Sequence, residues 1–166
     1  YKSLGTPDTP GVKIYQVIGH VQTPRIVEAP VGLTLRELIH TYGGGLRPGR
    51  NLKMCQTGGA SAPLVTAAHL DVPMDFGALA QAGGALGSGT MLVMDDSTCV
   101  VDFLRAAAVF FEHESCGQCT PCREGTLRLL QTITRISRGQ GRDEDLAFLE
   151  RLAATLQDAS FCPLGQ

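Results

Sequence analysis

The run Glu114-Ser-Cys-Gly-Gln-Cys-Thr-Pro-Cys-Arg-Glu-Gly125 carries three cysteines, Cys116, Cys119 and Cys122, and a fourth, Cys162, follows forty residues after the last of them. An iron–sulfur cubane has four iron corners, and each needs one thiolate ligand. A tight loop can reach three corners of so compact an object, so the fourth ligand must come from elsewhere in the fold. The pattern therefore predicts a [4Fe–4S] cluster bound by these four cysteines, in a protein that carries electrons.

The residues between the cysteines favour the same site. Gly117 allows the loop to fold tightly, so that backbone N–H groups of the loop can donate to cluster sulfides. Thr120 and Pro121 predict the start of a helix, with Thr120 as the N-cap and proline at the first helical position. Cys122 would then lie in the first turn, where the partial positive charge of the helix favours thiolates and an anionic cluster. Gly117, Gln118 and Thr120 are therefore candidate neighbours of the cluster.

Other uses of the cysteines fit the pattern less well. Structural zinc sites usually draw their ligands from two C-x-x-C pairs, whereas this chain offers three thiols plus one. A plant-type [2Fe–2S] cluster needs C-x4-C-x2-C spacing, which is absent. Three disulfides are disfavoured in a chain of this length with so many ordinary apolar residues. A four-cysteine zinc module that docks a partner, without redox activity, remains the alternative function.

Composition limits the classes of partner and location. The 166 residues support one domain or two small ones, and 43% hydrophobic residues are enough to build a core. A formal net charge of −2 gives no indication of nucleic-acid binding. The longest apolar stretch, Ala106 to Phe111, is far shorter than the ~20 residues that span a bilayer, so no membrane insertion is expected. No secretory signal pattern is present, which together with the clustered thiols favours a reducing, cytoplasmic setting.

The first part of the chain predicts an α+β domain over residues 1–96. Val12 to Ile18 alternates like a strand, and Arg25 to Glu28 returns as its hairpin partner. Thr34 and Glu37 form a capping-box pattern that opens a helix, which ends at the glycine run 43–45. We expect this helix to bury an apolar face made of Leu35, Leu38 and Ile39. Two further strands are expected, from Leu52 to Gln56 and from Gly89 to Met94. This order is compatible with a β-grasp.

The second part predicts a small helical bundle over residues 97–166. The first helix leads into the cysteine loop, the second runs from Thr120 to about Arg138, and the third opens with acidic residues 143–145. The apolar faces expected for the three helices are, in order, Val101, Leu104, Ala108 and Phe111; Leu129, Ile133 and Ile136; and Leu146, Leu149, Ala153 and Leu156. A helical hairpin of the last two would return Cys162 to the first three cysteines.

No other residues indicate a site. Cys55 and Cys99 are expected to be small core residues. His113, three residues before Cys116, could tune the cluster or exchange protons, but a polar residue at a helix end is the favoured interpretation. His20, His40 and His69 have no partner spacing that suggests a site. The glycine runs do not follow a strand and open a helix as a G-x-G-x-x-G fingerprint would, so no nucleotide site is expected. No Ser–His–Asp arrangement or carboxylate pair is indicated.

The run from Glu114 to Gly125 resembles the cluster signature of the flavin- and NADH-binding subunit of respiratory complex I and of related NAD(P)-linked hydrogenases and formate dehydrogenases. Three further stretches are similar to the C-terminal portion of that family: Val17-Ile-Gly-His-Val-Gln-Thr-Pro24, Val72-Pro-Met-Asp-Phe76 and Leu86-Gly-Ser-Gly-Thr-Met-Leu-Val-Met-Asp95. The resemblance therefore spans essentially the whole chain. It implies a ubiquitin-like β-grasp domain of the soluble-ligand-binding type, followed by a helical domain with one [4Fe–4S] cluster.

The resemblance also implies a function and partners. In this family NADH reduces FMN by hydride transfer, and the cluster takes electrons singly from the flavin. The FMN and NAD(P) sites belong to a preceding domain, so these residues are expected to be a piece of a longer subunit or to work with another chain, and not to oxidise NADH alone. Expected partners are other subunits of a multi-subunit redox complex, including further iron–sulfur proteins. Pro163 and Leu164 are candidates for the flavin-facing side, and Pro163 stands where many members have alanine.

Overall fold

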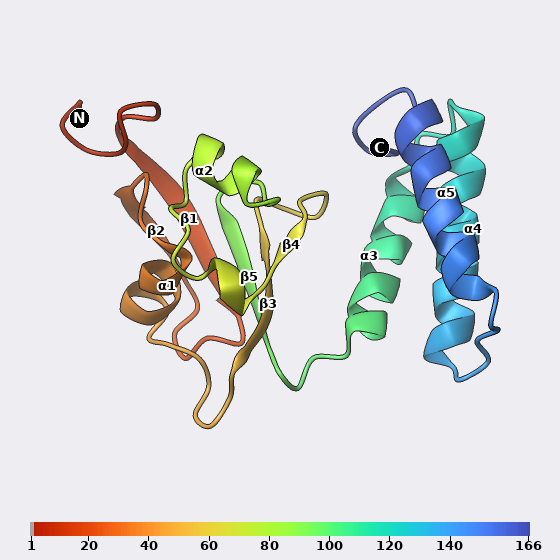
Figure 1. Cartoon of the computed structure of the whole chain (residues 1–166), viewed down its shortest axis with the longest axis horizontal. Helices are drawn as coiled ribbons and strands as arrows, with labels where there is room; N and C mark the ends of the chain where they lie inside the picture. Colours follow the sequence, from red (N-terminus) through yellow and green to blue (C-terminus); the bar gives the residue numbers. More distant parts are fainter. Residues whose placement is uncertain (1) are drawn as a thin grey trace. The chain divides into compact units, whose positions relative to one another are not determined.

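The computed structural model describes residues 2–166 and divides the chain into two compact units, Tyr1–Thr98 and Cys99–Gln166. The first contains a five-stranded sheet with short helices, and the second contains three helices (Figure 1). The fold is thus mixed, with the strands gathered before residue 98 and the long helices after it. Within the described residues, no helix combines the length and the hydropathy needed to cross a membrane.

The sheet has the strand order β2-β1-β5-β3-β4. The strands are β1 (Val12–Gly19), β2 (Arg25–Pro30), β3 (Leu52–Thr57), β4 (Leu64–Val65) and β5 (Thr90–Asp95). The pair β1 and β5 is parallel, and the other neighbours are antiparallel. Four of these strands agree with the predicted ones to within two residues at each end, whereas the two-residue strand β4 was not predicted.

One face of the sheet carries the core of the first unit. In β1, Tyr15 and Val17 are fully buried, while Ile14 and Gln16 on either side of Tyr15 are exposed, as the alternation of a half-buried strand requires. On the central strand β5, Met91 and Val93 are likewise fully buried. The Tyr15 hydroxyl donates to the backbone carbonyl of Met74 at 3.3 Å, so its one polar group is satisfied inside this core.

The predicted capping box is present. The Thr34 hydroxyl accepts from the Glu37 N–H at 3.1 Å, and the Glu37 carboxylate accepts from the Thr34 N–H at 2.8 Å. The helix α1 (Leu35–Glu37) that it opens continues as a π-helical turn, Leu38–Tyr42, and ends at Gly43. Leu35, Leu38 and Ile39 are fully buried, so the predicted apolar face is confirmed.

Two short helices of the first unit were not predicted. One is a 3₁₀ turn, Ala67–His69, and the other is α2 (Phe76–Gln81). The Asp75 side chain caps α2 by accepting from the Ala78 N–H at 2.7 Å. Leu79 of α2 is fully buried and joins the core.

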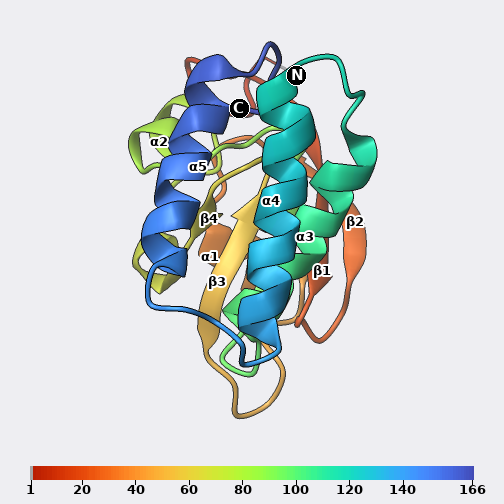
Figure 2. The same ribbon diagram turned by 90° about the vertical axis from the view of Figure 1, so that its right-hand side faces the viewer.

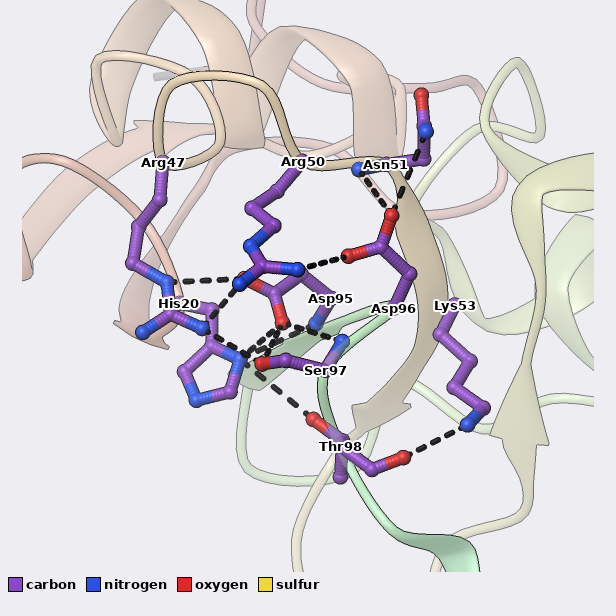
Figure 3. Close-up of polar contacts among 9 residues, drawn as sticks. All are labelled: His20, Arg47, Arg50, Asn51, Lys53, Asp95, Asp96, Ser97 and Thr98. Atoms are coloured by element: carbon purple, nitrogen blue, oxygen red, sulfur yellow. Dashed lines mark hydrogen bonds and ion pairs between the residues drawn. The ribbon is translucent and has the colours of Figure 1, made fainter.

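A polar cluster holds the end of β5, where the first unit ends (Figure 3). The buried Asp95 carboxylate accepts from the Ser97 hydroxyl at 2.6 Å and from Arg47 Nε at 2.9 Å, and its Oδ1 lies 2.9 Å from His20 Nδ1. Burial acts to raise the pKa of Asp95, but the hydrogen bonds from Ser97 and Arg47 outweigh it and lower the pKa well below its usual value. His20, for which the sequence offered no partner, thus has a structural one.

The second unit consists of α3 (Val100–Glu114), α4 (Thr120–Ser137) and α5 (Asp145–Ala159). Helix α4 packs against both α3 and α5 (Figure 2). The contact with α5 is very close at Gly125, because a Cβ atom added there would lie 2.6 Å from Leu156 Cδ2. Asp145 ties the turn between these helices together by accepting from the Arg142 N–H at 2.8 Å and pairing with the Arg135 side chain.

Some expected core positions of the second unit are wrong. Leu104 is 42% exposed, Leu146 is 72% exposed and Ala153 is exposed as well, whereas Ala108, Ile133 and Leu156 are buried as predicted. Leu146 is the second residue of α5, whereas the α5 residue that contacts Gly125 of α4 is Leu156. Cys55 is fully buried as expected, but Cys99 is exposed.

The exposure of Cys99 has a local cause. Its extended backbone makes it the N-cap of α3, a position outside the apolar stripe of the helix. The expectation of a core residue came from its apolar neighbours in sequence, and those neighbours belong to two different elements, β5 and α3.

Candidate iron–sulfur site

Three segments of the second unit meet at the N-terminal end of α4. These are the residues after α3, the cysteine loop that leads into α4, and the residues that follow α5. The N-cap of α4 is Cys119, with an extended backbone, and Thr120 is the first helical residue. The predicted N-cap was therefore wrong by one position. Cys122 still lies in the first turn, where unpaired backbone N–H groups favour negative charge.

Gly117 and Arg123 shape the cysteine loop. Gly117 has φ +75°, a left-handed conformation that side chains disfavour, so the tight turn predicted here depends on glycine. The Arg123 side chain donates from Nη1 to the Gly117 carbonyl at 2.7 Å and from Nη2 to the Thr120 hydroxyl at 3.4 Å. These bonds tie the loop to the first turn of α4 and hold a positive charge beside the cysteines.

Cys119 and Cys122 are both buried, and polar groups contact their sulfurs. The backbone N–H groups of Phe161 and Cys122 donate to Cys119 and lower the pKa of its thiol, against the opposing effect of burial. The hydroxyl of Ser115 lies 3.3 Å from Cys122 Sγ. Both sulfurs therefore lie within reach of polar groups, and at Cys119 these groups stabilise the thiolate.

The residues after α5 pack against the same end of α4. Gly165 is buried so closely there that an added Cβ atom would lie 3.0 Å from Cys122 Cβ and 2.5 Å from Ser160 Oγ. The Gly165 N–H donates to the Cys162 carbonyl at 3.1 Å, and the Gln166 side chain donates to the Ser160 carbonyl at 2.8 Å. The loop that carries Cys162 therefore returns to the first turn of α4, the path predicted from the helical hairpin.

The four cysteines are not drawn into one ligand set. Cys116 and Cys162 are exposed, all six cysteines are free, and no three ligating side chains among the described residues lie close enough together to hold a metal ion. The donor chemistry nevertheless fits a cluster: two buried sulfurs at a helix N-terminus are flanked on two sides by loops that each carry one more thiol. Residues 116–122 and 160–165 would hold the group.

Two serines of this region were missed by the sequence reasoning. Ser115 contacts Cys122, and Ser160 is buried with a hydroxyl that finds no hydrogen-bond partner in the part of the chain that is described. The position of Ser115 next to Cys116 was a usable signal, whereas that of Ser160 depends on the fold of the C-terminal residues. Of the other candidates, Gln118 and Pro163 are exposed and Leu164 is half-buried.

Comparison with known proteins agrees with this geometry. Residues 102–166 match the model of the NADH-ubiquinone oxidoreductase-F iron-sulfur binding region, and residues 14–64 match the SLBB domain. The F-type subunit of NADH-quinone oxidoreductase in Mycobacterium tuberculosis is 44% identical over 99% of this chain, and NADP-reducing hydrogenase subunit HndC of Solidesulfovibrio fructosivorans is 38% identical over all of it. The chain spans 37% and 34% of the lengths of these two relatives.

A solved structure gives the same result for the fold. The NAD+-reducing [NiFe]-hydrogenase in its H2-reduced state matches 99% of this chain with a TM-score of 0.86 and 33% identity, and the match covers 28% of the hydrogenase chain. The sequence and structure matches extend across both units, in the order SLBB domain then iron–sulfur binding region. The chain therefore carries an SLBB domain followed by an iron–sulfur binding region of the NADH-ubiquinone oxidoreductase F type, and it is similar to part of the longer relatives named above.

Proposed function

We propose that this chain is the electron-transfer module of an NAD(P)H-dependent oxidoreductase. Cys116, Cys119, Cys122 and Cys162 hold a [4Fe–4S] cluster that exchanges single electrons with an FMN bound outside these residues. The observation that carries the proposal is the meeting of the Cys162 loop with the first turn of α4, where a Cβ atom added at Gly165 would lie only 3.0 Å from Cys122 Cβ. Two segments far apart in sequence, each carrying thiols, thereby lie at the same end of α4.

The chain's own residues would bind and tune such a group. A bound cluster supplies a one-electron acceptor beside a two-electron hydride carrier. Arg123 and the N-terminus of α4 offset its negative charge, and Gly117, Gln118 and Thr120 form the loop around it. Pro163 and Leu164 lie in the loop with Cys162 and are assigned to the side that faces the flavin.

The two units can also be assigned to domain types. We assign residues 1–96 to a ubiquitin-like β-grasp domain and residues 97–166 to a helical-bundle domain. The support is the central parallel pair β1 and β5, flanked by the hairpin strand β2 on one side and β3 on the other, with α1 after the hairpin.

Cofactors and partners follow from the relatives. FMN and NAD(P) are assigned to a further domain or chain, because NADH-quinone oxidoreductase and NADP-reducing hydrogenase are the names of relatives that are longer than this chain. Partners are other subunits of a multi-subunit redox complex, including further iron–sulfur proteins, in the cytoplasm or on the cytoplasmic face of a membrane complex.

Metal analysis of anaerobically prepared protein tests the proposal. We expect four irons per chain, a brown colour and a cubane signal in electron paramagnetic resonance after reduction. A colourless preparation with one zinc per chain contradicts it and supports the zinc alternative.

Replacement of single cysteines tests the ligand set. Cys162→Ala removes one proposed ligand and should leave at most a three-iron species, whereas Cys99→Ala, at an exposed cysteine outside the cysteine loops, should retain four irons. The measurements are the iron content and the resonance spectrum of each variant. An intact cubane in Cys162→Ala removes Cys162 from the ligand set.

A further inference from the structure

The hydroxyl of Ser115 has a defined role toward the Cys122 sulfur. Ser115 is the first residue after α3, is half-buried, and has its Oγ 3.3 Å from Cys122 Sγ. Either atom can donate while Cys122 keeps its proton, but a metal-bound thiolate has no proton to give. In the loaded protein, the serine hydroxyl is therefore the donor of this hydrogen bond.

The surrounding loop fixes this direction. The Gly117 N–H lies 3.4 Å from Ser115 Oγ and donates to it, which occupies a lone pair of the oxygen and leaves the hydroxyl proton free for the sulfur. Gly117 is in turn held by Arg123, whose Nη1 donates to its carbonyl at 2.7 Å. Arg123, Gly117, Ser115 and Cys122 thus form one connected set of polar contacts, in which the Ser115 hydroxyl links the loop to the Cys122 sulfur.

We propose that Ser115 tunes the reduction potential of the cluster by donating a hydrogen bond to the Cys122 thiolate. This inference rests on the function proposed above. Reduction adds one electron from the reductant, a reduced flavin in that function, and no bond or proton is exchanged. The added negative charge spreads onto the cysteine sulfurs, so a donor on Cys122 stabilises the reduced state more than the oxidised state and raises the potential. Ser115 acts through a ligand and is a positioning residue.

Redox titration of the full chain, reconstituted anaerobically, tests this role. Dithionite with mediators supplies the electrons, and the cubane resonance signal reports the reduced fraction. Ser115→Ala should shift the midpoint to more negative values, by about tenfold in the reduction equilibrium or ~59 mV. Ser115→Thr keeps the hydroxyl and should restore the midpoint of the unaltered protein.

A matched control removes a hydroxyl from the other end of α4. Ser137 is the last residue of that helix, and its hydroxyl donates to Asp102 at 2.8 Å. Ser137→Ala should therefore leave the midpoint unchanged. If Ser115→Ala does not fold, Ser115→Gly removes the same hydroxyl at a position just after a helix, where glycine is well tolerated.

The outcomes separate this inference from the proposed function. An unaltered protein without a cubane signal overturns both. A cubane signal whose midpoint is the same in Ser115→Ala as in the unaltered protein overturns the tuning role alone. Loss of iron from both Ser115→Ala and Ser115→Gly, with retention in Ser115→Thr, also overturns it, because the hydroxyl then serves to hold the loop together.

Discussion

Asp95 is a buried carboxylate whose charge is stabilised by specific donors. Hydrogen bonds from Ser97 and Arg47 lower its pKa, and His20 lies against the same oxygen as Ser97 (Figure 3). A carboxylate with a lowered pKa contributes stability that is present above its unfolded pKa, about 3.9, and is lost as the pH falls toward its folded pKa. Acid should therefore weaken the first unit through this residue.

We expect Asp95→Asn to lower the free energy of unfolding of the first unit by more at pH 7 than at pH 3. The asparagine side chain keeps the shape but not the charge, so the difference between the two proteins should shrink as Asp95 becomes protonated. Urea unfolding at both pH values, followed by tyrosine fluorescence, measures this difference. Asp96→Asn is the control at a more exposed carboxylate of the same cluster. If Asp95→Asn lowers the free energy of unfolding by the same amount at both pH values, the charge of Asp95 does not stabilise the first unit.

At the scale of helices, the close approach of α4 and α5 depends on the missing side chain of Gly125. An added methyl group would overlap Leu156, so Gly125→Ala should destabilise the second unit by about 1–3 kcal/mol. The unfolding of the helices, followed by circular dichroism, measures this effect.

A double variant separates this overlap from a general effect of the substitution. Leu156→Ala removes the overlapping atoms, so its cost and that of Gly125→Ala should add up to more than the cost of the double variant. Strict additivity would mean that Gly125 is needed for a reason other than its contact with Leu156.

The elements that sequence predicted best have local signals. The capping box of α1 needs only Thr34 and Glu37, three residues apart, and β1 shows its alternation within eight residues. The start of α4 was predicted to within one residue from Thr120 and Pro121. The cysteine loop belongs to this group, because its spacing is a local property, as is the left-handed turn at Gly117.

The features that sequence did not predict depend on contacts between distant residues. Leu146 has the spacing of an apolar face, but whether it is buried depends on the rotation of α5 against Gly125. His20 gains its role only when β5 places Asp95 beside the end of β1. Ser160 reaches the cysteine region only through the return of the C-terminal residues, and no local pattern indicates that path.

At the scale of the whole molecule, the aromatic residues allow the two units to be observed separately. The chain has no tryptophan, and its three tyrosines lie at positions 1, 15 and 42, all in the first unit. Tyr15 is fully buried in the core of the sheet. Most helical residues, by contrast, belong to α3, α4 and α5 of the second unit. Tyrosine fluorescence therefore reports the unfolding of the first unit, and the circular dichroism signal of α-helix reports mainly the unfolding of the second unit.

We expect cluster binding to stabilise the second unit and to leave the first unchanged. A ligand raises the stability of the structure that binds it, and all four proposed ligands lie after residue 98. Thermal unfolding with and without iron should therefore shift the helical transition by several degrees and leave the tyrosine transition in place. A tyrosine transition that moves together with the helical one would show instead that the two units unfold as one.

The order of the strands also has a consequence for synthesis on the ribosome. β5 is the last strand to be made, yet it lies in the middle of the sheet, between β1 and β3. The hairpin of β1 and β2 can form once residue 30 has emerged, but the other edge of β1 stays open until β5 arrives some sixty residues later. At about 5–20 residues per second, that edge waits roughly 3–12 s. During those seconds the open edge of β1 can pair with strands of other chains, and the cysteine loop has not yet been synthesised.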